Sequence, residues 1–194
     1  DDAAGAAVEA AVAALLRELD AGVAPERAMG TAFDAALAAV SALDGPTTRH
    51  ASPSCTYVSG VVTAGWLAAS WVGDSRAYWV PADGEPVCLT VDHALADADG
   101  APHSAPLTRW VGADAGHGCA PVRMFEPPGP GRLVLCSDGL SRYLTGPVDL
   151  APVATEEPGA AARRLTQFAL DAGGVDNIAV VVLPYPPDDP GEHR

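Results

Sequence analysis

The apolar positions in the first third of the chain recur at helical spacing. They lie three or four residues apart at Val8, Val12, Leu15, Leu16 and Leu19. This pattern predicts a helix over residues 3–19, which Gly22 ends. Pro25 suits the first turn of a second helix that extends to about residue 43. One face of that helix carries Met29, Phe33, Leu37 and Val40.

From residue 55 the pattern changes to short runs of strand-forming residues separated by glycine-containing turns. These runs predict strands over 55–63, 66–72, 77–80 and 86–90. Residues 121–126 and 133–136 flank a segment rich in proline and glycine, which predicts a hairpin.

The last part of the chain predicts a short helix near Asp138, a helix over 158–172 and a strand over 177–183. Helices, then antiparallel strands, then a helix and a strand indicate an α+β layered domain over residues 1–183. Residues 184–194 are rich in proline and charge, and they predict a disordered tail.

Carboxylates stand where three of the strand-like runs start or stop. Asp74 and Asp138 each follow such a run, and Asp176 precedes the last one. Acidic side chains at strand ends gather at one rim of a sheet, where they repel one another unless a cation binds. Such hard oxygen ligands favour Mg²⁺ or Mn²⁺ over zinc or copper. Taken singly, Asp74 and Asp176 also fit ordinary turns, and Asp138 also fits a helix cap.

Composition narrows the class of partner. The net charge of −14 argues against binding of nucleic acid through its phosphates and against docking on anionic membranes. There is no apolar run of about 20 residues to span a bilayer, and no signal-peptide pattern at the start. The four cysteines form no C-x-x-C pair, so we expect buried thiols in a reducing cytoplasm rather than disulfides or zinc ligands.

Six short motifs, in order, resemble those of the metal-dependent type 2C serine/threonine protein phosphatases of bacterial type. They are Ser54-Cys55-Thr56, Val72-Gly-Asp-Ser-Arg76, Leu89-Thr-Val-Asp-His93, Leu107-Thr-Arg109, Ser137-Asp-Gly-Leu140 and Asp176-Asn177. Each motif alone is weak evidence. Their order over most of the chain is a strong signal.

The resemblance implies an antiparallel β-sandwich flanked by helices, in four αββα layers. It implies that a water activated by two metals hydrolyses phosphoserine or phosphothreonine in proteins. The cofactors would be Mn²⁺ or Mg²⁺, two and possibly a third per complete site. Asp138 and Asp176 would be the catalytic ligands of one core metal, and Asp74 a ligand of a third, weaker metal. Gly139 would let the backbone turn sharply, Asn177 would fix the rim through its side chain, and the partner would be a phosphoprotein, a target of a Ser/Thr kinase.

The chain departs from the family at its start. The family's opening strands and its Asp-Gly-x-Gly-Gly motif have no counterpart, because the sequence begins with Asp1-Asp2-Ala3-Ala4-Gly5. We therefore expect residues 1–183 to form a domain that is incomplete at its N-terminus and to hydrolyse phosphate esters slowly on its own. The alternative is a pseudophosphatase-like protein-binding module that keeps the fold without a complete metal site.

Overall fold

The computed structural model describes residues 2–43, 52–95, 106–116 and 118–187. Its helices are α1 (Asp2–Asp20), α2 (Pro25–Ser41), α3 (Asp138–Ser141) and α4 (Pro158–Asp171), with a 3₁₀ helix, η1, at Pro147–Val153. Its strands are β1 (Ser54–Cys55), β2 (Tyr57–Val62), β3 (Leu67–Val72), β4 (Arg76–Pro81), β5 (Val87–Cys88), β6 (Val111–Gly112), β7 (Val122–Phe125), β8 (Gly131–Cys136) and β9 (Val180–Tyr185). None of the helices in these ranges is long and apolar enough to cross a bilayer.

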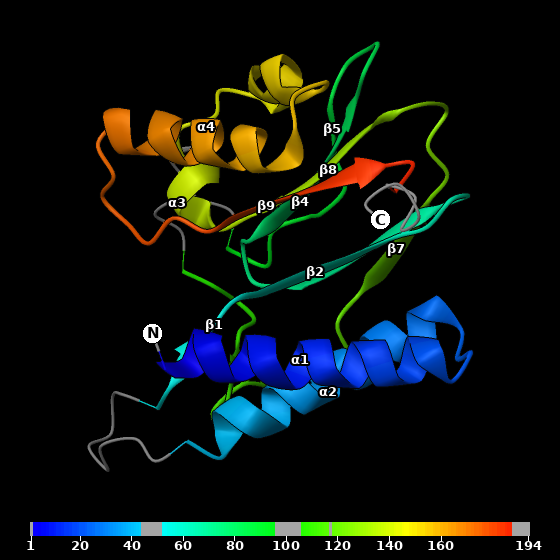
Figure 1. Cartoon of the computed structure of the whole chain (residues 1–194). Helices are drawn as coiled ribbons and strands as arrows, with labels where there is room; N and C mark the ends of the chain where they lie inside the picture. The colour runs from blue at the N-terminus through cyan, green and yellow to red at the C-terminus, as the bar shows by residue number, and fades with distance from the viewer. Residues whose placement is uncertain (1, 44–51, 96–105, 117, 188–194) are drawn as a thin grey trace.

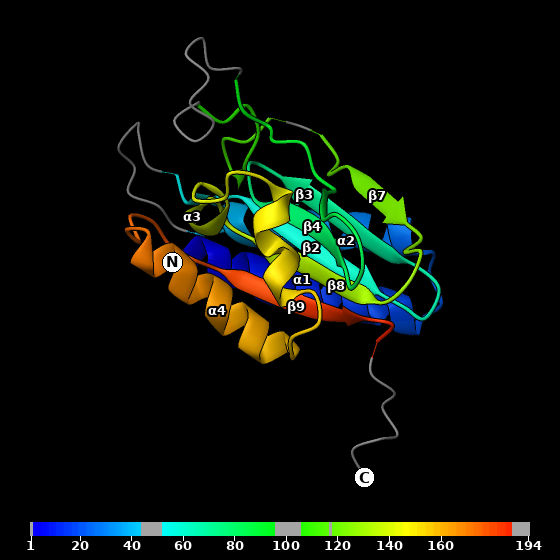
Figure 2. The same cartoon turned by 90° about the horizontal axis from the view of Figure 1, so that it is seen from above.

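The strands form two main antiparallel sheets that pack face to face. One sheet has the order β2-β3-β7 and the other β5-β4-β8-β9, and β1 pairs with β6 at one side. Helices α1 and α2 cover the outer face of the first sheet, and α3, η1 and α4 cover the outer face of the second (Figure 1 and, from above, Figure 2). These four layers confirm the predicted α+β sandwich flanked by helices.

Three apolar clusters hold the layers together. Between the sheets lie Leu67, Ala69, Ala77, Trp79, Leu89, Leu133, Leu135 and Tyr185. Tyr78 and Cys136 point the other way, toward α3, η1 and α4, because successive side chains of a strand alternate between its two faces. Tyr57 and Val72 face α1 and α2. The alternation of side chains along each strand therefore determines which residues pack between the sheets and which pack against the helices.

The packed face of α1 differs from the one that its large apolar residues suggest. Its buried residues are Ala3, Ala7, Ala11 and Ala14. Val8, Val12 and Leu16 are exposed instead. The buried alanines face α2, which buries Ala28, Ala32 and Ala36. Small side chains let the two helix backbones approach closely, so close packing of the pair decides which face of α1 is covered.

Several boundaries differ from the prediction. The hairpin expected over 121–136 is wrong: β7 pairs with β3, and β8 pairs with β4 and β9, so they lie in different sheets. The proline-rich segment between them carries the chain from one sheet to the other. The strand expected over 55–63 is interrupted at Thr56.

The C-terminal strand β9 begins later than predicted and continues through Pro184 and Tyr185, the first residues of the expected tail. The rest of that tail lies outside the described residues from position 188 onward. Of the four thiols expected to be buried, Cys136 is buried, Cys55 and Cys88 are partly exposed, and Cys119 is exposed; none forms a disulfide.

Candidate metal centre

The antiparallel register brings the three predicted acidic residues to one end of a sheet. Arg76, the first residue of β4, lies opposite Cys136, the last of β8, and Cys136 also lies opposite Val180, the first of β9. Asp74, Asp138 and Asp176 stand just outside these three strand ends. The start of β4, the end of β8 and the start of β9 therefore meet at one rim, as the sequence predicts.

Asp138 and Asp176 converge on a single nitrogen atom at this rim. Nη2 of Arg142 donates a hydrogen bond to Oδ2 of Asp138 and another, 2.9 Å long, to Oδ2 of Asp176. Nε of Arg142 also donates to the backbone oxygen of Asp138 at 3.2 Å. The two carboxylates come from segments far apart in the sequence, yet they share one cationic partner.

The pair has the chemistry of a site for one divalent cation. Mg²⁺ is commonly bound by one or two carboxylates of a protein, and waters complete its octahedral shell. Here two carboxylate oxygens point at the same position. Within the described ranges, no group of three or more His, Cys, Asp or Glu side chains is placed to hold a metal. Asp138 and Asp176 thus offer two carboxylate ligands to one cation at the position that Arg142 occupies, and among the described residues no third side chain of these types joins them.

Asp74 is close to this pair without joining it. Burial raises the pKa of Asp74, and the negative charge of Asp138 raises it further. Arg76 opposes this shift, and Asp92 adds to it. Asp74 is therefore held near a like charge at some energetic cost, which a cation bound between the two acids would relieve.

The turn that presents Asp74 is held from both sides. Gly73 has φ +102°, and a Cβ there would lie 2.5 Å from the methyl group of Thr56. On the other side, the Gly73 N–H donates to Nδ1 of His93 at 3.2 Å, and the His93 N–H donates to the Gly73 oxygen at 2.9 Å. His93 thus anchors the turn that carries Asp74.

Gly139 supports the site for a different reason than the one predicted. A Cβ on Gly139 would lie 2.3 Å from the carbonyl oxygen of Asn177, so glycine is required by close approach of two segments. The Ser137 hydroxyl joins the same segments, donating to the Asn177 oxygen at 2.9 Å and accepting from the Ala179 N–H at 3.0 Å. Among the described residues the bonds of Asn177 come from its backbone, not from its side chain as predicted.

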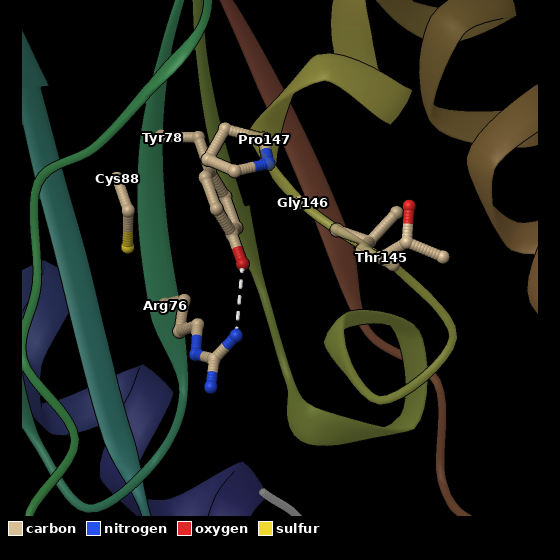
Figure 3. Close-up of a pocket in the computed structure, with 7 residues that line it drawn as sticks. Arg76, Tyr78, Cys88, Thr145, Gly146 and Pro147 are labelled. Atoms are coloured by element: carbon tan, nitrogen blue, oxygen red, sulfur yellow. Dashed lines mark hydrogen bonds between the residues drawn. The ribbon is translucent and has the colours of Figure 1, made fainter.

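Arg76 lies beside the rim, but its guanidinium already forms an ion pair with Asp92. Its Nε and Nη2 donate to both oxygens of Asp92, at 3.0 and 2.7 Å. Its Nη1 donates to the Tyr78 hydroxyl at 3.4 Å, at the wall of a cavity of about 270 Å³ (Figure 3). Cys88 and residues 144–147 complete the walls. The Asp92 carboxylate balances the guanidinium, which argues against Arg76 as a free phosphate ligand.

Two residues that shape the rim were not predicted. The sequence motifs include Ser137 without giving it a role, and they do not include Arg142. The spacing of four residues between Asp138 and Arg142, at a predicted helix start, is the signal that could have identified the ion pair.

Comparison with known proteins identifies the family of the chain. The family model described as Protein phosphatase 2C matches residues 1–167. The serine/threonine protein phosphatase PstP of Mycobacterium tuberculosis is 33% identical over 138 residues, covering 66% of this chain and 27% of PstP. The chain thus spans about a quarter of the length of this curated relative.

Solved structures show the same arrangement of layers. The crystal structure of the M. tuberculosis phosphatase PstP/Ppp matches with a TM-score of 0.72 and 25% identity, over 93% of this chain and 81% of that chain. The PstP catalytic domain in complex with two manganese ions matches with a TM-score of 0.68 and 26% identity, over 91% and 79%. PppA, a regulatory component of type VI secretion in Pseudomonas aeruginosa, matches with a TM-score of 0.64 and 26% identity, over 82% and 71%.

Proposed function

This chain belongs to the protein phosphatase 2C family, and from that premise we propose that it hydrolyses phosphoserine and phosphothreonine esters in proteins. The observation that carries the proposal is the convergence of Asp138 and Asp176 on one cation position. We propose Mn²⁺ or Mg²⁺ as the cofactor. The similar PstP catalytic domain, which holds two manganese ions, supports this choice.

When bound, such a cation lowers the pKa of a bound water and neutralises charge on the phosphoryl oxygens. The chain's own residues would position it. Asp138 and Asp176 would bind it through one carboxylate each, and Ser137 and Gly139 would keep the two segments at the required distance. Asp74 would bind a third, weaker cation together with Asp138, because the two acids are close enough for the charge of one to raise the pKa of the other.

We propose a phosphorylated protein, the target of a Ser/Thr kinase, as the substrate. The family membership and the kind of relatives support a protein substrate. We also propose a cytoplasmic location, which the four free cysteines support because disulfides are rare in reducing compartments.

A second candidate function is a pseudophosphatase-like module that binds proteins. Arg142 is the specific observation that favours it, because a guanidinium between Asp138 and Asp176 satisfies the carboxylate pair without a metal. The two candidates differ in whether the pair ever binds a divalent cation.

The deciding experiment measures hydrolysis of a phosphothreonine peptide in the presence of Mn²⁺. We expect activity that EDTA removes and that Asp138→Asn and Asp176→Asn each reduce at least about 100-fold, since losing one charged ligand costs roughly 3 kcal/mol or more. Asp34→Asn is the control, because it removes the same charge from an exposed position on α2. Hydrolysis that survives EDTA, or that both aspartate variants retain, would refute the proposed site.

A further inference from the structure

We propose that Arg142 is a built-in counter-cation of the Asp138–Asp176 pair, which a divalent metal must displace in order to bind. The residue thereby sets the metal affinity of this chain. This inference rests on the proposed function only in taking Asp138 and Asp176 as metal ligands.

The structure holds Arg142 in place through its own helix. The Arg142 N–H donates to the Asp138 oxygen at 3.0 Å, which closes the turn of α3, and Nε donates to the same oxygen at 3.2 Å. These bonds direct Nη2 at the two carboxylates. The guanidinium side chain is 19% exposed, and those of Asp138 and Asp176 are 26% and 43% exposed. The ion pair is thus partly sheltered, while solvent and ions still reach it from the Asp176 side.

The position of Nη2 is also the position that a shared cation would take. Both carboxylates present their Oδ2 atoms to this one nitrogen, so a metal bound by both oxygens would overlap with it. A divalent ion and a guanidinium also repel each other at such a separation. Binding of one therefore requires the other to leave.

An ordinary helix ion pair would not produce this arrangement. A pair spaced i, i+4 needs only Asp138 and Arg142, and its usual effect is a small gain in helix stability. Here the same nitrogen also binds Asp176, which is 34 residues away in the sequence and lies in the connection between α4 and β9. Arg142 neutralises the repulsion between the two acids in the absence of metal, and the long side chain can rotate into solvent when a metal replaces it.

The test measures Mn²⁺ affinity directly, without reference to turnover. Calorimetric titration of the full chain compares wild type, Arg142→Met and Arg17→Met. Methionine keeps the length of the side chain and removes its charge. Arg17 lies in the last turn of α1, a helix of the opposite layer (Figure 1). Among the described residues, its side chain hydrogen-bonds only to the adjacent Glu18, so its variant controls for net charge. We expect Arg142→Met to lower the Kd for Mn²⁺ at least tenfold and Arg17→Met to leave it unchanged.

A second measurement observes the displacement in the wild type. In an NMR titration with diamagnetic Mg²⁺, the Nε–H resonance of Arg142 should shift as its bond to the Asp138 oxygen is lost, and that of Arg17 should not. Because it uses the wild type, this titration shows whether the metal displaces Arg142 even if Arg142→Met does not fold.

The possible outcomes separate this inference from the proposed function. Equal Mn²⁺ affinity in wild type and Arg142→Met, or an Arg142 resonance that does not respond to Mg²⁺, would overturn the role of Arg142 and leave the metal site standing. Binding by Arg142→Met alone would support the inference and favour the protein-binding alternative for the wild type. Binding by neither protein would overturn the cation site itself.

Discussion

Replacing Gly139 by alanine should push apart the two segments that carry Asp138 and Asp176. An ideal Cβ on residue 139 would lie 2.3 Å from the Asn177 carbonyl oxygen and 2.9 Å from its carbonyl carbon. Ordinary contact begins at 3.4 Å, so the two segments must move apart by about 1 Å. The obstacle is backbone, which cannot rotate away as the end of a flexible side chain can.

The energetic cost follows from what that movement breaks. Overpacking of this kind costs roughly 1–3 kcal/mol. The segments are joined by the bonds from Ser137 to Asn177 and Ala179, and each bond that is lost costs about 1 kcal/mol. We expect Gly139→Ala to lower the free energy of unfolding by about 2–4 kcal/mol, which is roughly 4–16 °C in Tm for a chain of this length. A displacement near 1 Å at the reacting groups should also reduce turnover about 100-fold.

Urea denaturation of wild type, Gly139→Ala and Gly30→Ala measures the effect. Gly30 lies inside α2, and a Cβ there would have no atom within 4 Å. Because alanine favours helices over glycine, Gly30→Ala should raise the free energy of unfolding by about 0.5–1 kcal/mol. A Gly139→Ala variant as stable as wild type would show that the Asn177 backbone does not restrict the side chain at position 139.

Three further predictions concern the neighbouring charges. Burial and the charge of Asp138 raise the pKa of Asp74, so its ionised form destabilises the folded state. Asp74→Asn should therefore raise Tm at neutral pH, and this gain should disappear below the unfolded-state pKa of about 3.9. A lower Tm of the variant at pH 7 would contradict this. Burial and the charge of Arg109 lower the pKa of His93, so wild type should lose stability as pH falls through about 6.5. In thermal melts, the Tm of His93→Gln should depend less on pH than that of wild type. Identical dependence of Tm on pH in the two proteins would contradict this. Asp92→Asn should cost about 2–3 kcal/mol in urea denaturation because it leaves the Arg76 guanidinium partly buried without its carboxylate, and a loss under 1 kcal/mol would show that the pair is fully solvated.

The meeting of Asp74, Asp138 and Asp176 could be predicted because it follows from local rules. Strand-forming runs mark where strands end, and antiparallel neighbours bring the end of one strand beside the start of the next. Arg142 could not be found in the same way. Its role depends on the phase of α3, a helix of a single turn, and on the closeness of a segment more than 30 residues away.

The predictions about the fold that proved wrong have similar causes. The segment between β7 and β8 carries turn-forming residues, which suit a hairpin and a crossing between sheets equally well. The burial of the strands differs, since β8 is largely buried while Met124 in β7 is exposed, but this difference appears only in the folded chain. For α1, hydrophobicity favours valine and leucine as the packed face, whereas close approach to α2 selects alanine.

Anomalous scattering at the manganese absorption edge, from a crystal of the full chain equilibrated in millimolar Mn²⁺, would show directly whether Asp138 and Asp176 bind a metal in place of Arg142. We expect a peak between the Oδ2 atoms of the two aspartates, about 2.0–2.6 Å from each, with the Arg142 side chain turned away from both. A map without this peak, in which Arg142 is still bound to both carboxylates, would refute the proposed metal site.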